Sequence, residues 1–143
     1  MLKVKIKKSQ DAKIPSYAHQ DDSGADLYAS EDCTLEPMKI SLIGSGVHLA
    51  IPQGYEAQVR PKSGLALKHG IAFVNSIGTI DAGYRGEIKI IAINLSQVPY
   101  EVKKGTKIGQ LVFQKIEHAQ FEEAAELDET ARNHGGFGST GLK

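Results

Sequence analysis

Apolar and polar residues alternate with a period of two along most of this chain, and turn residues interrupt the alternation at short intervals. The opening MLKVKIKK shows the pattern, and β-branched residues dominate later stretches such as IKIIAIN. Successive side chains of a β-strand point to opposite faces, so this alternation predicts strands with one buried face. Many short strands separated by turns indicate an all-β fold, a jelly-roll-like barrel or sandwich.

Ten segments are predicted as strands, and one short segment is predicted as a helix. The strands are residues 2–7, 25–29, 33–35, 39–43, 47–50, 55–61, 71–80, 87–95, 100–102 and 107–115. Ser63 is a typical residue for a helix start, and Gly70 for a helix end, so one or two helical turns are expected between them. Residues 121–131 fit neither period well, and we expect an extended or weakly ordered connector there rather than a helix.

Charge and cysteine content narrow the function. Seventeen basic and seventeen acidic residues cancel, which argues against a general nucleic-acid binder but allows a small anionic ligand. Cys33 is the only cysteine, so an intrachain disulfide is impossible and a cysteine-based metal site is not expected. A single cysteine indicates a reducing, intracellular compartment. No stretch has the roughly 20 apolar residues of a membrane span, and no signal peptide is expected.

The segment GTIDAGYRGE, residues 78–87, carries the most chemistry. Two β-branched runs flank a short turn that contains Ala82 and Gly83, which predicts a β-hairpin. Its tip holds an acid, a phenol and a cation: Asp81, Tyr84 and Arg85. A tip that only had to turn would not need three such different groups. The hairpin end is therefore predicted to contact a ligand.

Four further residues have both a functional and a structural interpretation. Asp26 follows a turn and is either a metal-site carboxylate or an ordinary turn acid. Lys62 and Ser63 open the short helix, where backbone N–H groups attract phosphate, although a plain capped turn has the same residues. Gln110 stands among apolar residues and is either satisfied by its neighbours or directed at a ligand. The lysines before it are interpreted as a solvated face.

The glycine-rich tail RNHGGFGSTGLK begins at Arg132. Such a composition leaves few side chains to bury, so a mobile tail is expected. Phe137, Ser139 and Thr140, spaced by glycines, also suit a flat base and an anionic phosphate. From these residues alone a disordered terminus and a ligand-binding tail remain equally supported.

Five segments, SGADLYA, PKSGLALKHGI, NSIGTIDAGYRGEIKIIAIN, KKGTKIGQLVF and RNHGGFGSTG, resemble in order and spacing the five motifs of the trimeric deoxyuridine triphosphatases (dUTPases). The resemblance implies a jelly-roll homotrimer with active sites shared between subunits. It implies that the protein cleaves dUTP to dUMP and pyrophosphate with Mg²⁺ as cofactor. The dUMP would supply thymidylate synthesis. Neither nucleic acid nor membrane is an expected partner. A cytoplasmic location is expected, with the nucleus or a virus-infected cell left open.

The same resemblance assigns roles to individual residues. Asp81 matches the general base, and Asp26 matches a residue that holds Mg²⁺ through water. The nucleoside site is expected at Asn75, Gly78, Thr79, Ile80, Tyr84, Lys89 and Phe137. The triphosphate site is expected at Lys62, Ser63, Gly64, Gln110, Arg132, Gly138, Ser139 and Thr140. A domain at residues 1–131 would then be followed by a flexible lid at residues 132–143.

Three residues depart from the family pattern. Lys62 stands where arginine is usual, which replaces a bidentate fork by a point charge. Gly109 and Asn133 stand where alanine and glycine are common. Two alternatives to a dUTPase remain at this stage. One is a dCTP deaminase, or an enzyme with both activities, on the same fold; the other is a non-enzymatic β-barrel that has lost hydrolysis.

Overall fold

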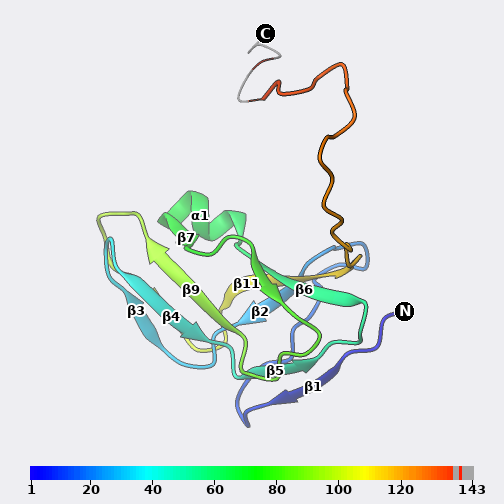
Figure 1. Cartoon of the computed structure of the whole chain (residues 1–143). Coiled ribbons are helices and arrows are strands. Elements are labelled where there is room, and N and C mark those ends of the chain that lie inside the picture. Colours follow the sequence, from blue (N-terminus) through cyan, green and yellow to red (C-terminus); the bar gives the residue numbers. More distant parts are fainter. Residues whose placement is uncertain (137–138, 140–143) are drawn as a thin grey trace.

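The computed structural model describes residues 1–136 and 139, and it is an all-β sandwich with one short helix (Figure 1). One sheet has the strand order β2-β11-β6-β8 and another the order β4-β9-β7, and β1-β5 and β10-β3 form two small sheets. The elements are β1 Lys5–Lys8, β2 Ala25–Tyr28, β3 Cys33–Leu35, β4 Ile40–Gly44, β5 Val47–Ala50, β6 Tyr55–Arg60, α1 Ser63–His69, β7 Ile71–Phe73, β8 Gly78–Ile80, β9 Lys89–Asn94, β10 Tyr100–Val102 and β11 Lys107–Lys115.

The core lies between the sheets and is built from the inward half of the alternating pattern. Every strand pair is antiparallel, and several buried residues lie opposite each other across the larger sheets, as Leu111 does with Val59 and Ile43 with Ile90. Burying one such side chain contributes roughly 1.5–3 kcal/mol. The fully or almost fully buried core residues include Leu27, Leu35, Val47, Ala57, Ile88, Ile90, Ala92, Val102 and Leu111. The all-β prediction is confirmed.

The predicted continuous strand at residues 71–80 is wrong, because the chain turns within it. β7 pairs with β9, and Val74 still donates to the carbonyl of Ile91 at 2.9 Å. Residues 74–77 then form a turn, and β8 joins the other sheet by pairing with β6. Within the described residues β8 does not pair with β9, so the loop that carries Asp81 connects two sheets instead of closing a hairpin.

The short helix begins and ends as predicted. Lys62 is its N-cap residue, with extended backbone and no side-chain hydrogen bond to the first turn. Gly70 ends the helix at φ 67°, a left-handed conformation that glycine adopts without a steric penalty. Its N–H donates to the carbonyl of Ala66 at 3.0 Å. α1 packs beside β7.

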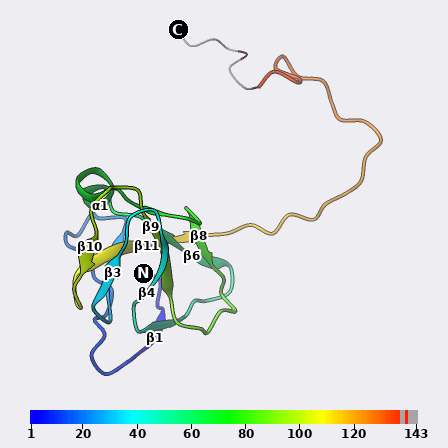
Figure 2. The same ribbon diagram turned by 90° about the vertical axis from the view of Figure 1, so that its left-hand side faces the viewer.

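After β11 the chain leaves the sandwich as an extended arm (Figure 2). The last backbone hydrogen bond to the body runs from Ile116 to the carbonyl of Gly54, at 3.0 Å. Residues 117–131 form neither helix nor strand, and all of them are exposed. The prediction of an extended connector at residues 121–131 is confirmed.

The described part of the chain contains no helix with the length and apolar character needed to cross a membrane.

Candidate functional site

The loop at residues 81–87 is held in place by its own backbone. The guanidinium of Arg85 donates to the carbonyls of Ala82 and Tyr84, at 2.6 and 2.8 Å, and the Tyr84 N–H donates to the carbonyl of Asp81 at 3.0 Å. A ring nitrogen of His48 lies 2.9 Å from the carbonyl oxygen of Arg85, which ties the loop to β5. The sequence placed Arg85 at a ligand; in the structure it secures the loop.

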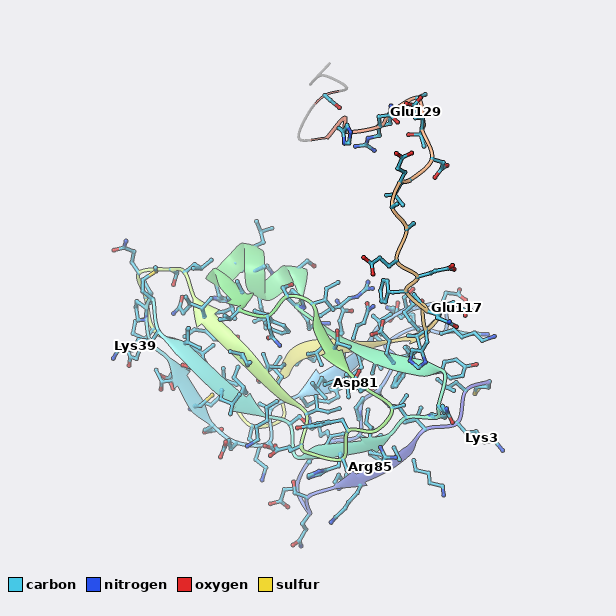
Figure 3. The ribbon with its side chains drawn as sticks, viewed as in Figure 1. Lys3, Lys39, Asp81, Arg85, Glu117 and Glu129 are labelled. Atoms are coloured by element: carbon cyan, nitrogen blue, oxygen red, sulfur yellow. The ribbon has the colours of Figure 1, made fainter. Side chains whose placement is uncertain are left out.

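The Asp81 side chain is exposed on this loop (Figure 3). It has no hydrogen-bond or ion-pair partner among residues 1–136 and 139. Ile80 and Tyr84, which lie close to it in the chain, line a hollow of about 500 Å³, together with Leu42, Glu87, Lys89 and Ile91. A free carboxylate on a fixed loop beside a largely apolar hollow is suited to act on a bound ligand or on a water molecule.

The Tyr84 ring is folded back over Gly86. A Cβ at position 86 would overlap the ring and its hydroxyl, so only glycine allows this position of the ring. The hydroxyl donates to the carbonyl of Glu87 at 3.0 Å, and the carboxylate of Glu87 pairs with Lys89 at 3.3 Å. One wall of the hollow is thus a tyrosine ring whose position is fixed by local contacts.

Asp26 is the centre of a second group of side chains. Its carboxylate is only 7% exposed and pairs with two lysines, Lys62 at one oxygen and Lys107 at the other, the latter at 2.6 Å. Burial alone raises the pKa of Asp26, but hydrogen bonds and charge from Lys107 and Lys62 hold it below its ordinary value. The same pairing acts in the opposite direction on the lysine, because the hydrogen bond to Asp26 raises the pKa of Lys107.

These three residues line a polar hollow of about 350 Å³ with Ala18, Asp22, Ser23, Gly24 and Gln110. Gln110 donates to the carbonyl of Pro61 at 3.0 Å, which directs its amide toward the start of α1. A Cβ at Gly24 would overlap that amide, so the glycine is needed for its position. Two ammonium groups in a concave site suit an anion with several charges.

The structure brings together some of the predicted site residues and separates others. Ile80, Tyr84 and Lys89 line the first hollow, and Asp26, Lys62 and Gln110 line the second. Asn75, Gly78 and Thr79 lie in the turn before β8 and on β8 itself. Ser63 and Gly64 form the first turn of α1, directly after Lys62. The two hollows have no lining residue in common.

The predicted residues of the tail lie away from both hollows or outside the described part. Arg132 is exposed on the arm and donates to the carbonyl of Gly135 at 2.7 Å. Ser139 is also exposed, and its N–H donates to the carbonyl of Gly136 at 3.0 Å. Phe137, Gly138 and Thr140 lie outside the described residues.

The sequence interpretation missed Lys107, which it assigned to a solvated face. Lys103 and Lys104 fit that interpretation, because they pair with the exposed carboxylates of Asp32 and Asp11. Lys107 instead reaches the buried Asp26. Its position only three residues before Gln110 is the one sequence feature that links it to the site. Regular alternation along a strand would nevertheless place these two side chains on opposite faces.

The polar hollow suits Mg²⁺ that arrives with a phosphate ligand. Among residues 1–136 and 139, no three His, Cys, Asp or Glu side chains converge as a metal cage. Mg²⁺ commonly keeps several waters and is bound by one or two carboxylates together with substrate phosphates. A buried Asp26 between two lysines that attract phosphate fits that mode of binding.

An all-β sandwich with a polar hollow that contains two lysines, an apolar hollow and an unpaired carboxylate is suited to hydrolysis of a phosphorylated ligand. Comparison with known proteins identifies the family. The dUTPase family model matches residues 10–141. The chain is 49% identical to the deoxyuridine 5′-triphosphate nucleotidohydrolase of Finegoldia magna, over 98% of this chain and 99% of that protein, and 51% identical to that of Clostridium tetani, over 98% and 96%. The chain belongs to the dUTPase family.

Solved structures agree with this assignment. The dUTPase of Staphylococcus bacteriophage 80alpha with dUPNHPP superposes with a TM-score of 0.90 at 27% identity, over 98% of this chain and 99% of that chain. A dUTPase of the S. aureus phage phi11, described with a structural Mg(II) ion, has a TM-score of 0.80 at 25% identity, over 87% and 97%. The jelly-roll fold expected from the sequence is confirmed.

Proposed function

We propose that the two hollows are the nucleoside half and the triphosphate half of a dUTP-hydrolysing site. The chain hydrolyses dUTP to dUMP and pyrophosphate with Mg²⁺ as cofactor, which is the activity of its family. The observation that carries the residue assignment is the fixed loop that holds the unpaired Asp81 between Ile80 and Tyr84, both of which line the first hollow. The comparisons give no support to the dCTP deaminase alternative.

The backbone around β8 selects uracil in this proposal. N–H and C=O groups of residues 75–80 pair with the edge of the base, with Asn75 and Gly78–Ile80 at the contact. Cytosine has the opposite donor and acceptor pattern at that edge, so its binding leaves buried polar groups unpaired. The Tyr84 ring, held over Gly86, packs against the deoxyribose and leaves no room for a 2′-hydroxyl.

Asp81 acts as the general base. Its carboxylate orients a water molecule and accepts a proton from it as the water oxygen attacks the α-phosphorus. The bond from the α-phosphorus to the bridging oxygen breaks, and pyrophosphate leaves with that oxygen. A carboxylate is a weak base toward water. Positioning and charge neutralisation therefore supply much of the acceleration.

The polar hollow holds the triphosphate. Lys62 and Gln110 line it, and the first turn of α1, with Ser63 and Gly64, has no side-chain cap and offers free N–H groups. Asp26 would hold Mg²⁺ through water molecules. When bound, Mg²⁺ neutralises charge on the phosphate oxygens. Lys62 lacks the bidentate fork of the usual arginine, so we expect a somewhat looser orientation of the triphosphate.

A homotrimer joins the two halves across subunits. One face of the β4-β9-β7 sheet is apolar and open: Ile40 and Leu42 are 64% and 57% exposed, and Ile91 and Ile93 lie opposite them on β9. An exposed apolar face of this kind marks a contact surface. Leu42 and Ile91 also line the nucleoside hollow, so a second subunit packed on this face borders the hollow directly.

Ile40→Asp is expected to weaken the trimer strongly, because it places a charge in the apolar interface. Light scattering of the wild-type protein should give three times the 15.4 kDa chain mass, and the variant should shift toward one chain mass. Leu67→Asp is the matched control, since Leu67 is an exposed apolar residue on α1 and not on a strand of this sheet. A wild-type protein of one chain mass contradicts the proposal.

The tail of the chain closes the site as a lid. Phe137 covers the uracil, and Arg132, Gly138, Ser139 and Thr140 contact the γ-phosphate. The arm carries residues 117–131 away from the body that bears Asp81 (Figure 3), which supports a lid delivered to the site of another subunit. Closure excludes water other than the attacking one.

The substrate is tested by pyrophosphate release from dUTP, dCTP, dTTP and UTP in the presence of Mg²⁺. Release is expected from dUTP, with a kcat/KM at least about a hundredfold above the other three. Release from dCTP alone, or from none of the four, contradicts the proposed function. A second measurement, of ammonia from dCTP, tests the deaminase alternative directly.

We place the protein in the cytoplasm. The single Cys33 excludes an intrachain disulfide, which agrees with a reducing compartment.

A further inference from the structure

Asp26 has two cationic partners, and only one of them belongs to the proposed triphosphate cradle. Lys62 precedes Ser63 and Gly64 at the start of α1, whereas Lys107 belongs to β11. The charged groups that line the hollow are Lys62, Lys107, Asp26 and Asp22. Asp22 accepts a hydrogen bond from the backbone N–H of His19, at 2.9 Å, and makes no ion pair within the described residues. The two lysines therefore share one carboxylate.

A β-bulge brings Lys107 to this carboxylate. Gln110 lies opposite Asp26 and Gly109 opposite Leu27, so regular pairing would place Ile108 opposite Tyr28. The register shifts between Lys107 and Gly109, and Lys107 lies opposite Tyr28 instead. It therefore shares a face with Asp26 and Gln110. Bulges are frequent next to active sites, where they redirect a side chain in this way.

Substrate binding changes the balance of these pairs. A triphosphate draws Lys62 off Asp26, since it offers several negative charges to one ammonium group. In the absence of metal, the departure of both lysines would leave the buried carboxylate without a charge partner among the described residues, which is costly. Lys107 is held by the pairing of β11 with β2, so it can remain on Asp26 when Lys62 moves.

We propose that Lys107 is a positioning residue, which keeps the Asp26 carboxylate paired and thereby frees Lys62 for the triphosphate. The inference rests on the proposed function, because it assumes that Lys62 binds the triphosphate. Lys107 acts through Asp26 and does not need to touch the substrate.

The test is calorimetric titration with the non-hydrolysable analogue dUpNHpp in EDTA, so that binding is measured without metal and without turnover. Lys107→Gln is expected to weaken binding about tenfold, because Lys62 stays on the carboxylate. Removing that carboxylate as well, in Asp26→Asn/Lys107→Gln, releases Lys62 and is expected to restore the affinity to within about threefold of wild type. Lys107→Arg retains the charge and should bind as wild type does.

Lys104→Gln is the matched control, because Lys104 lies in the adjacent turn and pairs with the exposed Asp11. Its analogue affinity should be unchanged. Wild-type affinity in Lys107→Gln overturns the inference, and so does a loss that persists in the double variant, which would indicate direct contact of Lys107 with phosphate. Turnover of dUTP and analogue binding by the wild-type protein are measured in the same series. If the wild-type protein shows neither, the proposed function fails; if it shows both and only the variants deviate from expectation, the inference alone fails.

Discussion

Asp81→Asn is expected to reduce dUTP turnover by at least about a hundredfold, the usual range for the loss of a general base. Asparagine has nearly the same shape but cannot accept the proton of the attacking water. The loop should keep its conformation, because Arg85, Tyr84 and His48 hold it through backbone carbonyls and not through the Asp81 side chain. Steady-state kinetics of pyrophosphate release measures the effect.

Binding separates a catalytic role from a structural one. The variant should bind dUpNHpp within about threefold of wild type, so that the loss appears in kcat rather than in KM. Asp11→Asn, at an exposed carboxylate paired with Lys104, should leave turnover unchanged. Turnover near the wild-type rate in Asp81→Asn would remove this residue from the role of base.

Deletion of residues 135–143 is expected to leave a folded trimer whose turnover is lower by on the order of a hundredfold. The sandwich core ends with β11, and Gly135 makes its backbone hydrogen bond only within the arm, to Arg132 at 2.8 Å. Stability therefore has little dependence on the deleted residues, whereas the proposed lid contacts to base and γ-phosphate are all lost. Thermal melting, light scattering and kinetics together measure the three expectations.

A shorter deletion, of Leu142 and Lys143 only, is the control and should keep full activity. It removes chain beyond the proposed contacts at Ser139 and Thr140. Either of two results would contradict the lid: a nine-residue deletion that unfolds the protein, or one that retains the wild-type rate.

The strands that were predicted well are mostly those in which alternation and turns agree. β3, β5, β10 and β11 have the predicted bounds. β3 and β10 alternate between turn residues, whereas β11 was recognised by its apolar, strand-forming composition despite the bulge. Residues 71–80 failed for a physical reason. Their β-branched residues favour a strand on both sides of Asn75 and Ser76, and the prediction treats the turn at these two residues as part of one strand. The choice of two different partner strands is made by tertiary pairing, which the local sequence does not encode.

The candidate site shows the same division. Motif residues such as Asp26, Lys62 and Gln110 were found from their order along the chain, and the structure places them around one hollow. Lys107 was missed because its direction depends on a bulge within β11. Gly86 and Gly24 look like ordinary turn glycines in the sequence. The structure shows that they make room for the Tyr84 ring and the Gln110 amide.

The separation of the two hollows, which share no lining residue, has a genetic consequence. In the proposed trimer, each reaction centre takes its base-recognising wall from one chain and its phosphate cradle from another. A chain with a defect in one half therefore damages the centre that uses this half and leaves the other centre to which it contributes intact. In a population of mixed assemblies, two alleles damaged in opposite halves would compensate one another in part, whereas two damaged in the same half would not. The activity in such a population then depends on which chains are combined in each trimer and not on any single chain.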